Sequence, residues 1–155
     1  MEQCMYLVST TLKPIELNQL QTMLTKTTYY AETTLSPLKI NEQEIAELIN
    51  SRIKVSKVLG IFCEFKHSNK LIVPHEEVGW IIFQESDSAI ELGFLYVYAK
   101  WRGVGVGKAA LRQFSTEFST KRIFSPVFSH NKISRKLHAD LGFTALQTIF
   151  YKPQL

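Results

Sequence analysis

The residues best suited to chemistry form a glycine-rich stretch, Arg102-Gly103-Val104-Gly105-Val106-Gly107-Lys108, which follows an apolar run from Ile90 to Tyr98. An amphipathic helical pattern begins directly after the glycines. A strand, a glycine-rich turn and a helix in succession expose backbone N–H groups that can hold a phosphate. Glycine tolerates positive φ and lets a ligand approach the backbone, and the helix N-terminus adds a partial positive charge. The stretch therefore predicts a phosphate-binding loop.

Three classes of phosphate site can be compared with this loop. A Walker A loop ends in Gly-Lys-Ser/Thr and begins with Gly, but position 109 is Ala and position 102 is Arg. A dinucleotide fingerprint matches Gly105, Gly107 and Ala110, but the acidic residue expected about 20 positions further on is missing. The third pattern, Arg-x-x-Gly-x-Gly, begins at Arg102 and fits the pyrophosphate arm of coenzyme A.

Two segments carry a resemblance to a known family. Residues 97–111 resemble the acetyl-CoA motif of the GNAT superfamily of N-acetyltransferases, and residues 131–143 resemble its later motif, an Asn followed by a helix that closes in Leu-Gly-Phe. The resemblance extends over residues 78–151, and the first half of the chain fits by general layout only. It implies an α/β fold (an α+β mixed sheet), the GNAT acyl-CoA N-acyltransferase fold, with a splayed, mostly antiparallel central sheet flanked by about four helices.

The resemblance also implies which residues bind acetyl-CoA. The strand before the loop would pair its backbone with the pantetheine arm, and the Leu95 N–H would face the acetyl carbonyl as an oxyanion donor. For Arg135, a solvated helix face is an equally open interpretation. The expected cofactor-binding residues are Leu95, Tyr96, Val97, Arg102, Gly103, Val104, Gly105, Val106, Gly107, Lys108, Asn131, Ser134 and Arg135.

Acetyl transfer from a thioester to an amine needs a base for the amine. Glu91 stands four residues before Leu95, so we expect both on the same face of the strand. Members of the family often have a catalytic Glu at this offset, which favours Glu91 as the base. The alternative is a carboxylate at the exposed start of the strand, or one paired with Lys or Arg. Glu85, near a turn, is a second candidate.

The leaving thiolate needs an acid. The family has Tyr in its later motif, where this chain has His138. Imidazole donates a proton near neutral pH more readily than phenol does, so His138 is a candidate general acid. Two alternatives stay open for His138. It can make a structural contact with the cofactor, or it can be a substitution that removed catalysis. The histidines show no spacing typical of metal ligands, and we expect no metal site.

The expected reaction moves an acetyl group from acetyl-CoA to a primary amine of a small molecule or peptide, by direct transfer in a ternary complex. Tyr29, Tyr30 and Trp80 are candidate acceptor-binding residues, although core packing is an equal alternative for the two tyrosines. His138 keeps open a competing class, a regulatory module that binds acetyl-CoA without turnover.

The composition of the 155 residues sets limits on class and location. The length predicts one domain over residues 1–155. No apolar run approaches the roughly 18 residues of a membrane span. The N-terminus lacks a signal pattern. Two cysteines are too few for a disulfide framework. We therefore expect a cytoplasmic protein that does not contact membranes. The family also makes a homodimer possible.

The net charge of +4 is unevenly distributed, because residues 1–99 carry −4 and residues 100–155 carry +8. The positive half holds the glycine-rich loop, as expected for a protein that binds the phosphates of coenzyme A. A nucleic-acid surface is less favoured, because no nucleic-acid-binding motif accompanies the basic residues.

Apolar periodicity predicts the elements that position these groups. Pro14 fits the first turn of a helix, Gly142 ends the last helix, and Ile133 and Leu137 start its buried stripe. Residues 66–77 are predicted as a loop, with room for a short edge strand at 70–73. Strands are expected at 6–9, 58–65, 78–83, 89–97, 123–128 and 145–151, and helices at 14–25, 42–52, 106–118 and 134–141.

Overall fold

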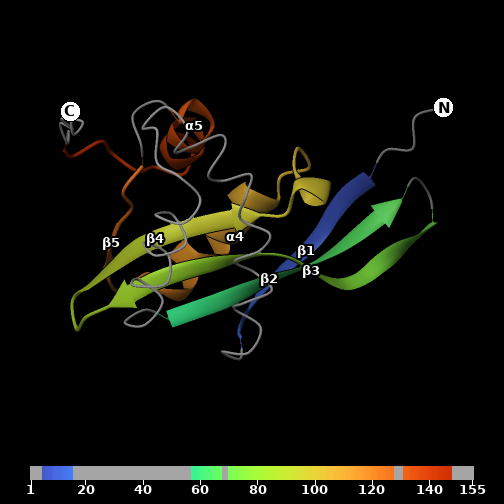
Figure 1. The fold of residues 1–155 in the computed structure, drawn as a ribbon, viewed down its shortest axis with the longest axis horizontal. Coiled ribbons are helices and arrows are strands. Elements are labelled where there is room, and N and C mark those ends of the chain that lie inside the picture. The colour runs from blue at the N-terminus through green and yellow to red at the C-terminus, as the bar shows by residue number, and fades with distance from the viewer. Residues whose placement is uncertain (1–4, 16–56, 68–69, 128–130, 148–155) are drawn as a thin grey trace, which may run out of the picture.

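The computed structural model describes residues 5–15, 57–67, 70–127 and 131–147, with only the backbone of 70–75. Its strands form one twisted sheet in the order β1-β2-β3-β4-β5 (Figure 1). The first four strands pair antiparallel, and β5 pairs parallel with β4. The mixed, mostly antiparallel sheet predicted from the sequence is confirmed. The strands are β1 (Met5–Pro14), β2 (Lys57–His67), β3 (Lys70–Glu85), β4 (Ala89–Val97) and β5 (Arg122–Phe124).

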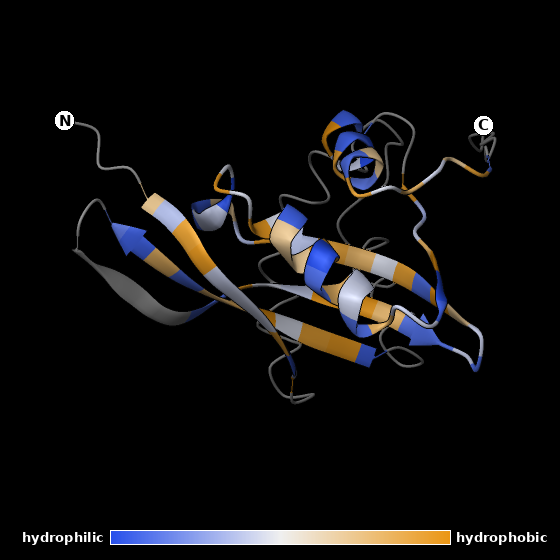
Figure 2. Cartoon of the chain, turned by 180° about the vertical axis from the view of Figure 1, so that it is seen from behind, coloured by the Kyte–Doolittle hydropathy of each residue, from blue (hydrophilic) through white to orange (hydrophobic). Residues whose placement is uncertain are grey.

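The helices of the described residues are α4 (Val106–Glu117) and α5 (Lys132–Asp140), with a 3-10 turn η4 (Ala99–Trp101). Figure 2 shows α4 lying across one face of the sheet with its apolar side turned toward the strands. Val106, Ala110 and Phe114 are buried and Phe118 is half-buried, so the predicted apolar stripe is confirmed. No described helix is long and apolar enough to span a membrane.

The core lies between α4 and the sheet. The Phe83 ring meets the Phe114 ring edge-on at 5.1 Å between centroids. The Trp101 ring stacks on Phe65 at 4.6 Å, which anchors the turn before the glycine-rich loop to β2. Aromatic and branched side chains of four strands and α4 thus hold the loop against the sheet.

Pro14 lies at the end of β1, opposite Leu59, and not in a helix, so that prediction was wrong. An edge strand tolerates Pro because one side of its backbone needs no ladder partner. The rest of the helix predicted at 14–25, except Ile15, and all of the helix predicted at 42–52 lie outside the described residues.

The loop predicted at 66–77 is also wrong, because β2 and β3 continue through it as a long hairpin. The short strand expected at 70–73 is present as the start of β3. Pairing passes from Cys63↔Glu76 to Phe65↔Val73, so Pro74 falls in a register irregularity. A bulge places Pro where no ladder hydrogen bond is required, which is why polar residues and a Pro did not end the strand.

Of the last two predicted strands, the one at 123–128 is shorter than expected. The one at 145–151 is not formed at 145–147, and residues 148–151 lie outside the described part of the chain. β5 ends at Phe124, and the next three residues are not in a strand. Pro126 has no N–H to donate to a ladder, which limits the strand. Residues 145–147 are exposed and form no strand, and Leu146 is 80% exposed, so no packed face holds them in a sheet.

Candidate active site

Strands β4 and β5 separate shortly after they meet. Only Ala89–Glu91 of β4 pairs with Arg122–Phe124 of β5. Beyond these pairs β4 runs on to Val97, while the chain leaves β5 toward α5 (Figure 1). Among the described residues, one backbone edge of β4 from Leu92 to Val97 therefore has no strand partner. Such an edge can pair with an extended ligand through main-chain hydrogen bonds.

The glycine-rich loop joins β4 to α4 in the conformation that glycine favours. Gly103 has φ 80° and Gly105 has φ 88°, and a Cβ built on either would meet no atom within 4 Å. Gly105 is the N-cap of α4 and offers no side chain to the first-turn amides. The open loop and these amides suit an anion such as a pyrophosphate.

Two cations flank the loop in different ways. Arg102 donates from Nε to the Val97 carbonyl at 2.8 Å, and its guanidinium lies 5.3 Å from the centroid of the Tyr96 ring. Lys108 is exposed and lies 3.7 Å from Asp140 of α5. The main partner of Asp140 is Lys136, whose hydrogen bond lowers the pKa of that carboxyl. Lys108 is thus only loosely held and can turn toward a phosphate.

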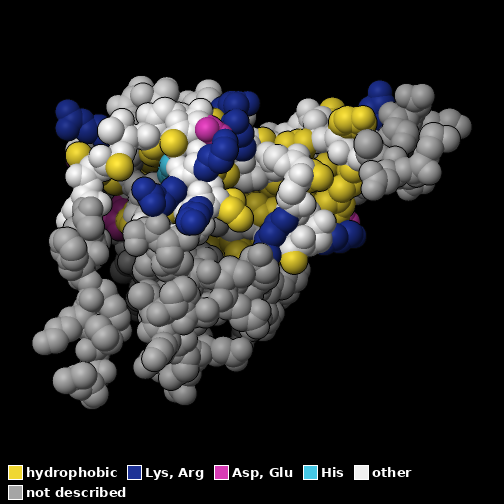
Figure 3. All heavy atoms as spheres, turned by 90° about the horizontal axis from the view of Figure 1, so that it is seen from above, with side chains coloured by type: hydrophobic (Ala, Val, Ile, Leu, Met, Phe, Trp, Pro, Cys, Tyr) yellow, Lys and Arg dark blue, Asp and Glu magenta, His cyan; other side chains and the backbone are white. Residues whose placement is uncertain are grey.

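Figure 3 shows Lys and Arg side chains gathered on the face seen from above, on the side of the sheet where α5 lies. The exposed cations of this half of the described chain include Lys100, Lys108, Lys132, Arg135 and Lys136. The positive half predicted from the sequence thus presents its charge at the surface.

A bulge in β4 changes the relation between Glu91 and Leu95. Ile82 pairs with Phe94 and Phe83 with Leu92, so Gly93 is an extra residue in β4. The side chain of Leu95 packs against the core cluster, whereas Glu91 is exposed on the other face. The expectation that both lie on one face was wrong, because each extra residue inverts the alternation of a strand.

Glu91 instead shares its face with an aromatic cluster. Trp80 pairs with Tyr96, and their rings stack at 5.4 Å, while Phe94 lies edge-on at 6.5 Å from Trp80. All three rings are buried. The Trp80 Nε1 atom is buried and has no hydrogen-bond partner among the described residues.

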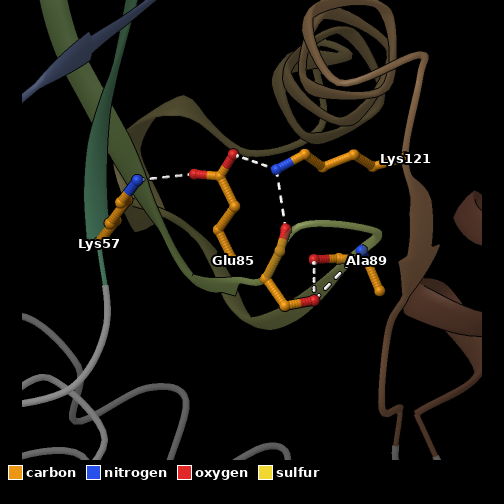
Figure 4. A network of polar contacts seen from close by, with 5 residues as sticks. Lys57, Glu85, Ala89 and Lys121 are labelled. Atoms are coloured by element: carbon orange, nitrogen blue, oxygen red, sulfur yellow. Dashed lines mark hydrogen bonds and ion pairs between the residues drawn. The ribbon is translucent and has the colours of Figure 1, made fainter.

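Glu85 is held in an ion-pair network at the surface (Figure 4). Its two carboxylate oxygens each lie 2.6 Å from an ammonium nitrogen, one of Lys57 and one of Lys121. The hydrogen bonds from Lys121 and then Lys57 lower the pKa of Glu85 to about 2. A carboxylate held in this way is a weak proton acceptor, which argues against Glu85 as the base.

His138 is the buried polar side chain of the described part, at 8% exposure. Its Nε2 lies 2.6 Å from Ser125 Oγ, and its Nδ1 lies 2.7 Å from the Ser134 carbonyl oxygen. Its ring also meets the Phe143 ring edge-on at 5.0 Å. Both ring nitrogens of His138 therefore have hydrogen-bond partners. Nδ1 contacts the backbone of α5, and Nε2 contacts the Ser125 hydroxyl.

The second motif forms helix α5 as predicted, and Gly142 follows it with φ 86°. Asn131 caps the helix, because its Oδ1 accepts from the Ser134 N–H at 3.1 Å. Arg135 is exposed. The predicted buried stripe is confirmed at Leu137 and Leu141, which pack against the core, and is wrong at Ile133, which is 83% exposed.

Helices α4 and α5 meet at Gly107. A Cβ on Gly107 would lie 3.3 Å from Leu137 Cδ1 and 3.9 Å from Val97 Cγ2. The glycine therefore lets α5 pack closely against the start of α4, next to Val97 of β4.

Some site residues were missed or lie outside the described part of the chain. Tyr29 and Tyr30 fall among the residues that the structure does not describe. Ser125 was missed, because a single Ser after a strand has no distinctive sequence signal. The bulge at Gly93 had a signal, since Gly inside a strand pattern often marks a bulge.

The splayed sheet and the open glycine-rich loop at the N-terminus of α4 are the features of the GNAT fold expected from the sequence. Residues 42–143 match the Acetyltransferase (GNAT) family. The chain belongs to this family of N-acetyltransferase enzymes.

Individual relatives agree with the family. The chain is 26% identical over 151 residues to the uncharacterized N-acetyltransferase YycN of Bacillus subtilis (strain 168), which covers 91% of this chain and 96% of YycN. The crystal structure of YycN has a TM-score of 0.68 at 21% identity, over 95% of this chain and 99% of that one. A ribosomal-protein-alanine N-acetyltransferase from Brucella melitensis biovar Abortus 2308 has a TM-score of 0.62 at 18% identity, over 95% and 100%. An aminoglycoside 6'-N-acetyltransferase from Acinetobacter haemolyticus has a TM-score of 0.53 at 18% identity, over 94% and 98%.

Proposed function

We propose that this chain transfers an acetyl group from acetyl-CoA to a primary amine, directly and within a ternary complex. The observation that carries the proposal is the loop of Gly103 and Gly105, open and in left-handed conformation, at the uncapped N-terminus of α4. Backbone amides of residues 103–108 would hold the pyrophosphate, and Arg102 and Lys108 would add charge. Acetyl-CoA supplies the activated acyl group.

The unpaired edge of β4 supports a place for the pantetheine arm beside Leu95, Tyr96 and Val97. A Leu95 N–H aimed at the acetyl carbonyl would stabilise the oxyanion in the transition state. Asn131, Ser134 and Arg135 belong to the helix that flanks this edge, and we assign them to the cofactor as well.

The opposite face of β4 supports the acceptor site. Glu91 is exposed there, on the same face as the buried Trp80 ring and its unused Nε1–H donor. Glu91 would take the proton of the incoming amine, directly or through water, and Trp80 would orient the acceptor. The structural neighbours include acetyltransferases of a ribosomal protein and of an aminoglycoside, which supports a small molecule or a peptide as the acceptor.

The first test is binding. Acetyl-CoA should raise the melting temperature of the purified chain, whereas NAD and ATP at the same concentration should not. Calorimetry that finds no uptake of acetyl-CoA by folded protein would end this proposal.

The second test is turnover. We expect free thiol to be released from acetyl-CoA in the presence of at least one amine from a panel of N-terminal peptides, lysine peptides, polyamines and aminoglycosides. Uptake of acetyl-CoA without thiol release across the panel would favour instead a regulatory module, the second candidate, because His138 replaces the Tyr of the family motif.

A further inference from the structure

The pair Ser125–His138 gives the site a feature that the family motifs do not contain. The Nδ1 atom of His138 lies 2.7 Å from the Ser134 carbonyl oxygen, which can only accept a hydrogen bond. Nδ1 must therefore carry a proton in either charge state. The Ser134 hydroxyl lies farther from this nitrogen, at 3.4 Å, and adds little.

With Nδ1 fixed as a donor, Nε2 is the only ring atom of His138 that can gain or lose a proton. That atom lies 2.6 Å from Ser125 Oγ. Neutral His138 accepts the hydroxyl proton of Ser125, and charged His138 donates to Ser125 Oγ, whose own proton must then point elsewhere. Because the ring is only 8% exposed, the Ser125 hydroxyl is the direct outlet for its proton.

The pair lies where the sheet divides. Ser125 directly follows Phe124, the last β5 residue that pairs with β4. On the other side, Leu137 precedes His138 and lies against Gly107 of the loop helix. The Ser125 hydroxyl therefore lies just past the last pair of β4 and β5, against His138 of the helix that packs on Gly107.

We propose that Ser125 and His138 form one proton-transfer unit, in which His138 stores the proton and the Ser125 hydroxyl delivers it to the leaving thiolate. This inference depends on the proposed acetyl transfer. In the step, the Nε2–H bond of charged His138 breaks as a new O–H bond forms at Ser125. The original O–H bond of Ser125 breaks as the S–H bond of coenzyme A forms. His138 is then neutral. The amine releases one proton during the transfer, and uptake of one proton returns His138 to its charged form.

The pairing itself is tested on the full chain without any ligand. Nitrogen-15 NMR of the histidine rings should show neutral His138 with its proton on Nδ1 and an accepted hydrogen bond at Nε2. In Ser125→Ala the Nε2 signal should shift while the Nδ1 proton stays. A neutral ring with its proton on Nε2 would overturn the proposal.

Measurement of kcat in variants of Ser125 distinguishes delivery of a proton by its hydroxyl from a purely structural role. Ser125→Ala should lower kcat by about 100-fold, with KM and Kd for acetyl-CoA unchanged. Ser125→Thr, which keeps a hydroxyl, should recover most of the loss. The matched control is Ser115→Ala. It removes a half-buried hydroxyl that, among the described residues, bonds the Leu111 carbonyl within α4, and it should leave kcat unchanged.

The outcomes are distinguishable. A wild-type kcat in Ser125→Ala, with normal uptake of acetyl-CoA, overturns the proton-transfer unit alone. Lack of uptake by the wild-type chain overturns both the proposed function and this inference. A Ser–His pair can also activate serine as a nucleophile, so a stable acetyl group on Ser125 after incubation with acetyl-CoA, seen by intact mass, would overturn delivery and assign acyl transfer to Ser125.

Discussion

Single atoms decide how β3 and β4 approach each other at Gly79. A Cβ built on this residue would lie 2.0 Å from the Tyr96 carbonyl oxygen and 3.0 Å from Val97 Cα. Backbone atoms cannot rotate away as a flexible side chain can. Any larger residue at position 79 must therefore separate two strands of the sheet at the residues where the cofactor is proposed to bind.

We expect Gly79→Ala to lower the free energy of unfolding by about 3 kcal/mol, at the upper end of the cost of overpacking. Urea denaturation measures the change. Gly103→Ala is the matched control, because its cost comes only from a φ of 80° in open space and should be about 1 kcal/mol. An equal loss in the two variants would contradict the steric argument.

Glu91 is the residue on which the proposed base depends. We expect Glu91→Gln to lower kcat by about 100-fold or more, since an amide cannot take the proton of the amine, with Kd for acetyl-CoA unchanged. Thiol release and calorimetry give the two quantities. Glu117→Gln, on the exposed side of α4, is the control and should keep the wild-type kcat. Normal turnover in Glu91→Gln would remove Glu91 from the mechanism.

At the scale of a helix, the N-cap of α5 can serve two purposes. The Oδ1 of Asn131 accepts from the Ser134 N–H and starts the helix that carries His138. The proposed function also gives Asn131 a contact with the cofactor. Ser can supply the cap but lacks the amide donors of Asn.

Substitutions at this position separate the two roles. Asn131→Ala should lower the free energy of unfolding by about 1 kcal/mol through loss of the cap. Asn131→Ser should restore stability to within a few tenths of a kcal/mol, yet bind acetyl-CoA more weakly than the wild-type chain. Thermal unfolding and calorimetry provide the comparison. If Asn131→Ser binds as tightly as wild type, Asn131 is only a helix cap.

Local patterns predicted some elements well and others poorly. Strand β4 and helix α4 were predicted correctly. The period of the apolar residues, two for a strand and 3.6 for a helix, agrees in both with the position of the flanking glycines. The same signals placed the glycine-rich loop correctly between them. Pro14 and residues 66–77 were misread, because their strand structure depends on partners far away in the sequence and on bulges that accommodate Pro74.

The site was predictable only where it depends on local sequence. Gly103 and Gly105 adopt the left-handed conformation that the glycine-rich motif indicates. The faces of Glu91 and Leu95 were not predictable, because one extra residue at Gly93 inverts the alternation. The contact between Ser125 and His138 joins two segments 13 positions apart, and only the tertiary fold brings them together.

Across the whole molecule, Glu85 connects three separate parts of the fold. It lies at the end of β3 and binds Lys57 at the start of β2 and Lys121 in the turn after α4 (Figure 4). Lys121 also donates to the Ser86 carbonyl at 2.8 Å. The network joins the sheet to the segment that leads into β5.

This network should make stability depend on pH. The pKa of Glu85 falls from the ordinary 4.5 to about 2 in the folded chain, so the network stabilises the fold fully above pH 4.5. As the pH falls from 4.5 toward 2, the unfolded state takes up a proton more readily and this contribution is lost. Urea denaturation over this range should show a shallower pH dependence in Glu85→Gln.

The control for this experiment is Asp87→Asn, in the adjacent turn, since the described part of the chain gives Asp87 no ion pair. Its pH dependence should follow that of the wild-type chain. Identical curves for the wild type and Glu85→Gln would show that the two lysines do not stabilise the folded carboxylate.

The two tryptophans of the sequence provide an intrinsic optical readout of both halves of the site. Trp101 stacks on Phe65 next to the glycine-rich loop, and Trp80 lies among the rings on the face that carries Glu91. Indole fluorescence responds to the polarity around the ring. A chain with Trp80→Phe would emit only from beside the loop, and one with Trp101→Phe only from the opposite face, so the arrival of each substrate can be timed separately without an added dye.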